Sequence, residues 1–130
     1  GEAVVFTHNN AHRHFFSIQK QHGAVIAKGR LIGVQFEALF TDNLYFDISK
    51  HAIDMAMKVR DLFRSRGYRF YLDSPSNQQF VVMTKEQADA LSKNIQFTYF
   101  GQTDNGDVIA RFVTSWSTTE EELAELAKYI

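Results

Sequence analysis

The sequence contains no cysteine among its 130 residues. This absence excludes disulfide bonds, a thiolate nucleophile and any metal site built on cysteine. Positive charge is not in excess either, because 14 lysines and arginines stand against 15 aspartates and glutamates, which gives a formal net charge of −1. Such a chain has no basic field for nucleic acid and no polybasic arm for a membrane surface. We therefore expect neither nucleic acid nor a membrane as a partner.

Long apolar runs are missing as well. No stretch approaches the roughly 18 residues that a membrane-spanning helix needs, and no signal peptide is visible, so we expect a cytoplasmic protein. The 45% hydrophobic content is nevertheless enough for a packed core. The sequence begins at Gly1 and runs at once into the strand-like residues 3–6, so we expect this chain to be a piece of a longer protein.

The first forty residues differ in character from the rest. After the expected strand over 3–6, the pattern is mainly helical from 11 to 40, with a break near Gly23. Apolar residues between 25 and 40 spread round most of the helical cylinder, which is typical of a helix buried in a larger body or against another subunit. We assign 1–42 to a strand and linker helices of a neighbouring domain.

Residues 43–130 predict a unit of their own. Apolar residues from Ile48 to Phe63 follow one helical face, and Gly67 is placed to end that helix. Four strands are expected, over 68–72, 79–83, 95–99 and 107–115. An antiparallel sheet with helices packed on one face is the economical arrangement, so we predict the α+β fold class.

Three local signals connect these elements. Asn105-Gly106 is typical of a type I′ hairpin turn. Thr84 with Gln87, and Thr118 with Glu121, have the spacing of capping boxes that open a short helix and the last helix.

Arg111 is a permanent cation on an otherwise apolar strand. Its fork of donors matches a carboxylate or a phosphate, and a buried cation without a partner would cost several kcal/mol. Asp73, Asp104 and Asp107 are candidate internal partners. The pattern alone leaves both readings open, a structural or exposed arginine and a ligand anchor.

Other polar clusters are weaker candidates. Lys20 and the amides up to Gly23 could bind a phosphate, although a solvated helix face explains the same residues. His8, His12 and His14 could ligate a metal, but no carboxylate lies among them, so we assign no metal site. No complete catalytic motif is present, and we assign no catalytic residue.

Three stretches carry a family resemblance: KQHGAVIAKGRLIGVQFEALFTDNLYF, GYRFYLDSPSNQQFVV and VIARFVTSWSTTEEEL. Together they resemble the C-terminal part of the threonine aldolase and aromatic amino acid β-eliminating lyase family. These enzymes use pyridoxal phosphate on the aspartate-aminotransferase type of fold. The resemblance implies that residues 43–130 are the small C-terminal domain and that the Schiff-base lysine lies upstream of Gly1.

Two residue roles follow from the resemblance. Arg111, within RFVTSW, corresponds to the arginine that binds the α-carboxylate of a small amino-acid substrate. Lys20, within KQHG, corresponds to a basic position near the cofactor phosphate, reached from the neighbouring subunit of a homodimer or homotetramer. Close relatives read Lys-Gln-Arg-Gly there, so His22 replaces an arginine with a side chain that is only partly charged at neutral pH.

The expected function is therefore part of a threonine aldolase-like lyase, which splits the Cα–Cβ bond of a β-hydroxy-α-amino acid into glycine and an aldehyde. Without the upstream lysine, the chain alone is expected to be inactive. The alternatives are β-elimination from an aromatic amino acid and a non-catalytic α+β binding or dimerisation module.

Overall fold

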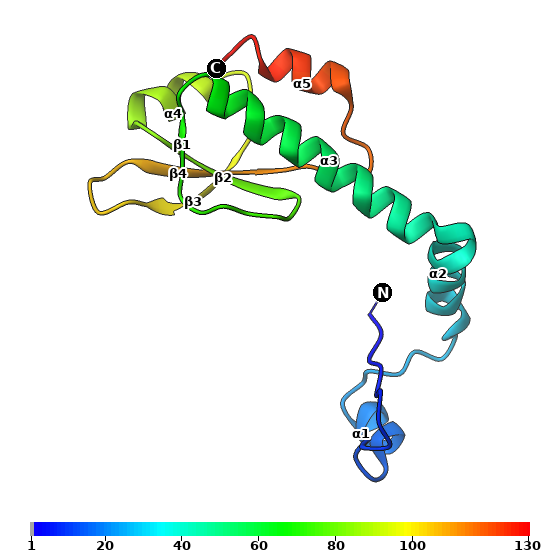
Figure 1. The fold of residues 1–130 in the computed structure, drawn as a ribbon. Helices are drawn as coiled ribbons and strands as arrows, with labels where there is room; N and C mark the ends of the chain where they lie inside the picture. The colour runs from blue at the N-terminus through cyan, green and yellow to red at the C-terminus, as the bar shows by residue number, and fades with distance from the viewer. Residues whose placement is uncertain (1) are drawn as a thin grey trace. The chain divides into compact units, whose positions relative to one another are not determined.

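The computed structural model describes residues 2–130 and divides the chain into two compact units (Figure 1). The first unit ends at Tyr45 and the second is Phe46–Ile130. This division lies close to the sequence-based boundary after residue 42. Each unit is described by itself.

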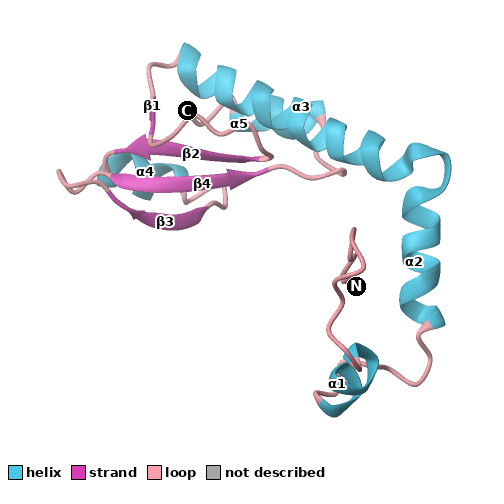
Figure 2. Cartoon of the chain, turned by 60° about the horizontal axis from the view of Figure 1, so that its bottom comes forward, coloured by secondary structure: helices cyan, strands magenta, loops and turns pink. Residues whose placement is uncertain are grey.

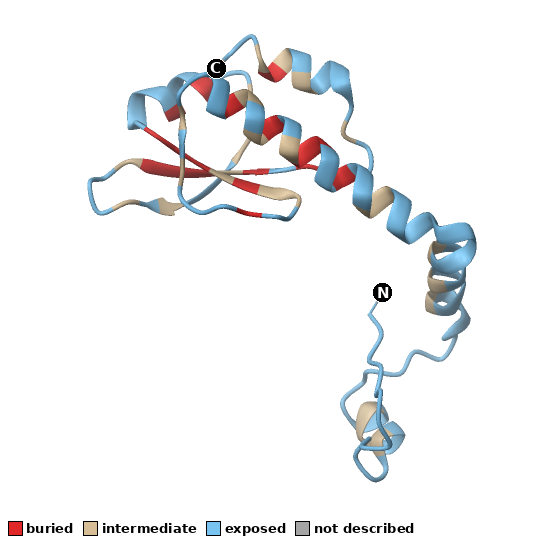
Figure 3. Ribbon diagram, in the orientation of Figure 1, coloured by how far each residue is buried: buried red, intermediate tan, exposed pale blue. Residues whose placement is uncertain are grey.

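The first unit is helical and has little core. Helix α1 is Phe15–Gln21, helix α2 is Arg30–Phe40, and the 3₁₀ helix η1 is Thr41–Asn43. Gly23 has a φ of 68°, a value that favours glycine, and it lies in the expected break between the helices. No residue among 2–45 is buried (Figure 3).

The prediction of a strand over 3–6 is wrong for the part of the chain that the structure describes. Residues 2–6 form no strand, although the side chains of 3–6 are apolar and two of them, Val4 and Val5, are β-branched. Val4 and Val5 remain largely exposed. A strand needs a neighbour to satisfy its backbone N–H and C=O groups, and the described sheet contains only β1 to β4. The local sequence therefore shows strand propensity without a partner strand.

Helix α3, Leu44–Ser65, is the main helix of the second unit. Its end matches the expectation, because Gly67 has a φ of 80°. The Gly67 N–H donates to the Arg64 carbonyl at 3.0 Å, and the Tyr68 N–H donates to the Phe63 carbonyl at 3.1 Å. The Tyr68 ring then meets the Phe63 ring edge-on, with 5.2 Å between centroids. These contacts are the hydrogen bonds and the apolar contact of a Schellman motif.

The predicted α+β fold is confirmed. Strands β1 (Arg69–Phe70), β2 (Gln78–Met83), β3 (Thr98–Gln102) and β4 (Val108–Val113) form one sheet in the order β1-β2-β4-β3. All its neighbouring strands are antiparallel. Helices α4 (Lys85–Leu91) and α5 (Glu120–Leu126) complete the unit (Figure 2).

Strand β3 begins three residues later than the alternation of 95–99 predicted. Ile95 and Phe97 are partly buried and pack against the core from the connection before the strand. Tyr99 pairs with Ala110 and Gly101 pairs with Ile109, so Phe100 is an extra residue that forms a bulge. The alternation of 95–99 therefore predicted correctly that Ile95 and Phe97 are partly buried, but it predicted wrongly that these residues pair as a strand.

The type I′ turn predicted for Asn105-Gly106 is wrong. That turn needs positive φ at both central residues, whereas among the described non-glycine residues positive φ occurs only at His14, Asp42 and Asn43. Gly106 alone is left-handed, at 85°. The Gly106 N–H donates to the Thr103 carbonyl and the Thr103 N–H donates to the Asp107 carbonyl, each at 2.9 Å. This pattern fits a type I turn followed by a left-handed glycine.

One capping box is where the sequence predicted it, and the other is displaced by one residue. Thr84 and Gln87 cap α4 reciprocally, at 3.2 and 2.9 Å. At α5 the pair is Thr119 with Glu122, not Thr118 with Glu121. The Thr118 hydroxyl instead accepts a hydrogen bond from the Ser115 N–H at 2.9 Å. The run Thr-Thr-Glu-Glu-Glu allows either threonine to cap the helix. The hydrogen bond from Ser115 occupies the Thr118 hydroxyl, so Thr119 is the cap.

The core lies on one face of the sheet. Val81 and Met83 of β2, and Val108, Ala110 and Phe112 of β4, join buried residues of α3, α4 and α5 in one cluster. Phe63 of α3 and Phe112 of β4 have ring centroids 4.8 Å apart. Because side chains alternate across a strand, the intervening residues Ile109, Arg111 and Val113 lie on the opposite face. Figure 3 shows the buried positions along one side of α3 and on the two central strands.

Phe63 is one of the α3 side chains that pack into the core against the sheet, and it is 0% exposed. We predict that Phe63→Ala lowers the free energy of unfolding by about 3–5 kcal/mol, because it removes the ring and leaves a cavity. Urea unfolding followed by circular dichroism measures this change. The matched variant Phe16→Ala, at a 64% exposed phenylalanine, should change it by less than about 0.5 kcal/mol. Equal losses in both variants would contradict the assigned core.

Candidate functional site

Arg111 lies in the middle of β4, on the face of the sheet that no described helix covers. Its partners across the ladder are Phe80 on β2 and Thr98 on β3. Two strands therefore fix the position of its backbone from either side. The side chain is half-buried, and its Nε atom is buried.

Within residues 2–130, the guanidinium of Arg111 has no ion pair and its buried Nε has no hydrogen-bond partner. Two of its expected partners are occupied elsewhere. Asp73 lies 3.2 Å from Arg64, and Asp107 lies 2.8 Å from Arg69. Asp104 does not pair with Arg111 either. The internal ion pair that the sequence left open is therefore not formed among the described residues.

A shallow hollow of about 420 Å³ lies beside Arg111. Its walls are Gln96, Phe97, Thr98, Arg111 and Val113. Arg111 is the one ionised group in this lining, so the hollow carries a single positive charge. A guanidinium with free donors in a partly desolvated hollow can bind a carboxylate with two parallel hydrogen bonds.

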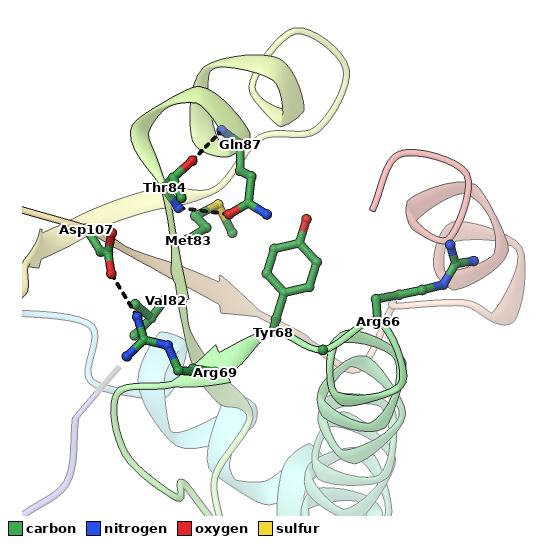
Figure 4. A pocket seen from close by; sticks show the side chains of 9 residues that line it. Arg66, Tyr68, Arg69, Val82, Met83, Thr84, Gln87 and Asp107 are labelled. Carbon is green, nitrogen blue, oxygen red and sulfur yellow. Dashed lines mark hydrogen bonds and ion pairs between the residues drawn. The ribbon is translucent and has the colours of Figure 1, made fainter.

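A second hollow, of about 180 Å³, is lined by more charged side chains, but its two arginines already have partners in the protein (Figure 4). Arg69 pairs there with Asp107. Arg66 donates to the carbonyl groups of Ile130 at 3.0 Å and Ala127 at 3.4 Å. Both guanidinium groups are thus used in holding the fold together. This leaves the hollow at Arg111 as the stronger candidate for an anion.

Lys20 lies in the last turn of α1 and is exposed. The backbone amides that could have joined it around a phosphate are already used. His22, Gly23 and Ala24 donate to the carbonyls of Ile18, Lys20 and Gln19 at 2.9–3.1 Å. The expected combination of a cation with free amides is therefore absent from this described segment, and Lys20 offers a point charge alone. Lys20 and Arg111 belong to different units.

The structure gives no support for a metal site at the histidines near the start of the chain. Among residues 2–130, no three histidine, aspartate or glutamate side chains come together as a metal site would require. Within the same range, no helix combines the length and the apolar character needed to cross a membrane.

Sequence reasoning missed Gln96 and Thr98, which share the hollow with Arg111. A signal for them was present. The alternation of 95–99 places Ile95 and Phe97 on the core side, and both pack there. The polar residues that alternate with them, Gln96 and Thr98, must then lie on the other side, which is also the side of Arg111.

Comparison with known proteins extends this local picture. No protein-family model matches the sequence, and comparison with curated proteins finds no match. Among solved structures, threonine aldolase from Leishmania major matches with a TM-score of 0.84 and 32% sequence identity. The match covers 88% of this chain and 34% of that chain. The chain resembles threonine aldolase.

This result confirms the resemblance that the three sequence motifs indicated. The threonine aldolase-like chain spans about a third of the length of the Leishmania protein. The expected α+β class is also consistent with this match, because the four-stranded sheet and its helices lie within the chain. The match itself assigns no role to Arg111 or Lys20.

The stability of an Arg111 variant tests whether this residue forms an internal ion pair. Because no ion pair of Arg111 is lost among the described residues, we predict that Arg111→Met changes the free energy of unfolding by less than about 0.5 kcal/mol or increases it. As a control, Arg66→Met removes two hydrogen bonds to the end of the chain and should cost about 1 kcal/mol. Urea unfolding measures both. A loss of about 3 kcal/mol for Arg111→Met would indicate a broken buried ion pair.

Proposed function

We propose that this chain is the C-terminal segment of a pyridoxal-phosphate-dependent lyase of the threonine aldolase kind. The complete protein would split a β-hydroxy-α-amino acid into glycine and an aldehyde. The observation that carries the proposal is the unpaired guanidinium of Arg111, which lies beside a hollow in a chain that matches threonine aldolase over 88% of its length.

Arg111 would bind and orient the substrate carboxylate. The planar guanidinium can bind both carboxylate oxygens. The backbone of Arg111 lies on β4, which is held between β2 and β3. Fixing the carboxylate restricts rotation of the substrate and places the Cα–Cβ bond for cleavage. Such positioning contributes to rate because less orientational freedom remains to be lost in the transition state.

Pyridoxal phosphate, when bound, supplies the electron sink for this cleavage. The described residues of this chain form no cradle for it. Lys20 would contribute one positive charge to the cofactor phosphate, without support from the amides that follow it. We therefore propose that the cofactor is held mainly by other parts of the complete protein and that this segment does not catalyse alone.

We also propose that the complete protein is a cytoplasmic homodimer or homotetramer. Support comes from the exposed apolar side chains of the first unit, where Phe16 and Leu31 are both 64% exposed. Apolar surface of this kind is typical of a protein interface.

Two other functions remain to be tested against this proposal. A β-eliminating lyase acting on an aromatic amino acid would form pyruvate instead of glycine, so product assays separate it from an aldolase. A non-catalytic α+β module would neither bind the cofactor as part of a larger protein nor form either product.

In the complete protein, we predict that Arg111→Lys raises KM by about one to two orders of magnitude, because a lysine ammonium cannot reproduce two parallel hydrogen bonds to a carboxylate. Binding of pyridoxal phosphate should be unchanged. Steady-state kinetics and titration of the cofactor by its absorbance measure the two quantities.

Arg69→Lys is the matched control, because Arg69 is an arginine of the same sheet that pairs with Asp107 outside the Arg111 hollow. Its KM should remain near that of the unaltered protein. Near-normal kinetics in Arg111→Lys would refute the carboxylate role, and a parallel loss of cofactor binding would show a wider structural effect.

A further inference from the structure

Asn105 lies at the tip of the β3–β4 hairpin, directly before Gly106, and both residues are exposed. It is the one asparagine in the sequence that a glycine follows. Gly106 has no side chain, and apart from its chain neighbours no heavy atom lies within 4 Å of the position that a β-carbon there would occupy. No side chain therefore crowds the Gly106 end of this peptide bond.

Asparagine in such a setting is chemically labile. When hydroxide removes the proton of the following backbone N–H, that nitrogen can attack the side-chain Cγ. A new bond forms between this nitrogen and Cγ, the bond from Cγ to the amide nitrogen breaks, and ammonia leaves after taking a proton from water. Water then opens the resulting succinimide ring at either carbonyl and gives aspartate or isoaspartate. The net change is the consumption of water and the release of ammonia, so no other reactant is needed.

The hairpin turn restrains this reaction. The Gly106 N–H donates to the Thr103 carbonyl at 2.9 Å, and the Asp107 N–H donates to the Thr103 hydroxyl at 3.2 Å. While the turn is closed, the Gly106 nitrogen is held by its hydrogen bond and cannot reach the Asn105 side chain. Attack therefore requires the turn to open locally, and these hydrogen bonds set the free energy of that opening.

Asn94 offers a comparison within the same part of the chain. It is exposed, like Asn105, and the N–H that follows each of them donates to a backbone carbonyl at 2.9 Å. The residue after Asn94 is Ile95, whose β-branched side chain packs against the core and is stiff. The two asparagines thus differ mainly in the residue that supplies the attacking nitrogen.

We propose that Asn105 is a site of spontaneous deamidation and that opening of the hairpin turn controls its rate. Both products place a new carboxylate between Asp104 and Asp107 in the sequence, so the formal net charge becomes one unit more negative than −1. The new charge lies two residues from the Asp107–Arg69 ion pair. Isoaspartate also lengthens the main chain of the turn. This inference is independent of the proposed function, because it involves neither Arg111 nor pyridoxal phosphate.

The test is incubation of the folded protein at pH 8 and at pH 6, followed by digestion with trypsin and mass spectrometry. Cleavage after Lys93 and Arg111 gives one peptide, residues 94–111, that contains both asparagines. Fragment masses assign deamidation to Asn94 or Asn105, and electron-transfer fragmentation distinguishes isoaspartate from aspartate. A sample digested without incubation corrects for conversion during digestion. Asn105 should be converted to both products, faster at pH 8, while Asn94 keeps its amide.

Thr103→Val tests the control by the turn, because it removes the hydroxyl that accepts from Asp107. The rate at Asn105 should rise about fivefold, the effect of one hydrogen bond on the opening of the turn. Thr98→Val is the matched control, at an exposed threonine of β3 away from the turn, and should leave the rate unchanged. Asn105→Gln should abolish conversion at this position, since its longer side chain does not form the succinimide ring.

The synthetic peptide 94–111 lacks the folded turn and should lose the Asn105 amide faster than the protein does. Equal losses at Asn94 and Asn105, or formation of aspartate without isoaspartate, would overturn the proposed site. So would a rate in the protein more than about a hundredfold below that of the peptide, because an exposed loop tip opens more readily than this. Equal rates in the protein and the peptide, or an unchanged rate in Thr103→Val, would overturn the control by the turn.

Discussion

Burial of α3 on one face of the sheet is the constraint on which the second unit depends. Phe63 of the helix and Phe112 of β4 meet at 4.8 Å, within a cluster that includes residues of α4 and α5. Each residue of β4 that enters this core places its neighbour on the other face. The packing that stabilises the unit therefore also determines that Arg111 lies away from the helices, in line with Ile109 and Val113.

This arrangement leaves the guanidinium of Arg111 partly buried and unpaired among the described residues. Arginine cannot lose its charge on burial, and partial desolvation of an uncompensated cation is costly. Two aspartates near the sheet pair with other arginines, Asp73 with Arg64 at 3.2 Å and Asp107 with Arg69 at 2.8 Å. Within residues 2–130, no protein carboxylate uses the donors of Arg111. A binding site held by a stable scaffold commonly shows such a local cost.

Sequence patterns were reliable where one local interaction decides the structure. The apolar face of α3 and the left-handed Gly67 fixed a helix and its end, and Thr84 with Gln87 fixed the start of α4. They failed where two local solutions compete. Thr118 and Thr119 are both suitable caps, and the alternation at Ile95 and Phe97 is the same for a buried connection and for a strand. The apolar residues 3–6 have strand propensity, but propensity cannot supply a neighbouring strand.

For the site, the sequence identified the cation but not its surroundings. Whether Arg111 is paired depends on where distant aspartates fall in the fold, and only the tertiary structure gives that position. Gln96 and Thr98 were recoverable in principle from the alternation, but polar residues on a strand are ordinarily just solvated. The most direct test of the account is a crystal structure of the complete protein with a bound amino acid. We predict that both carboxylate oxygens lie about 3 Å from guanidinium nitrogens of Arg111. A structure in which Arg111 instead pairs with a protein carboxylate, and the amino acid binds elsewhere, would contradict it.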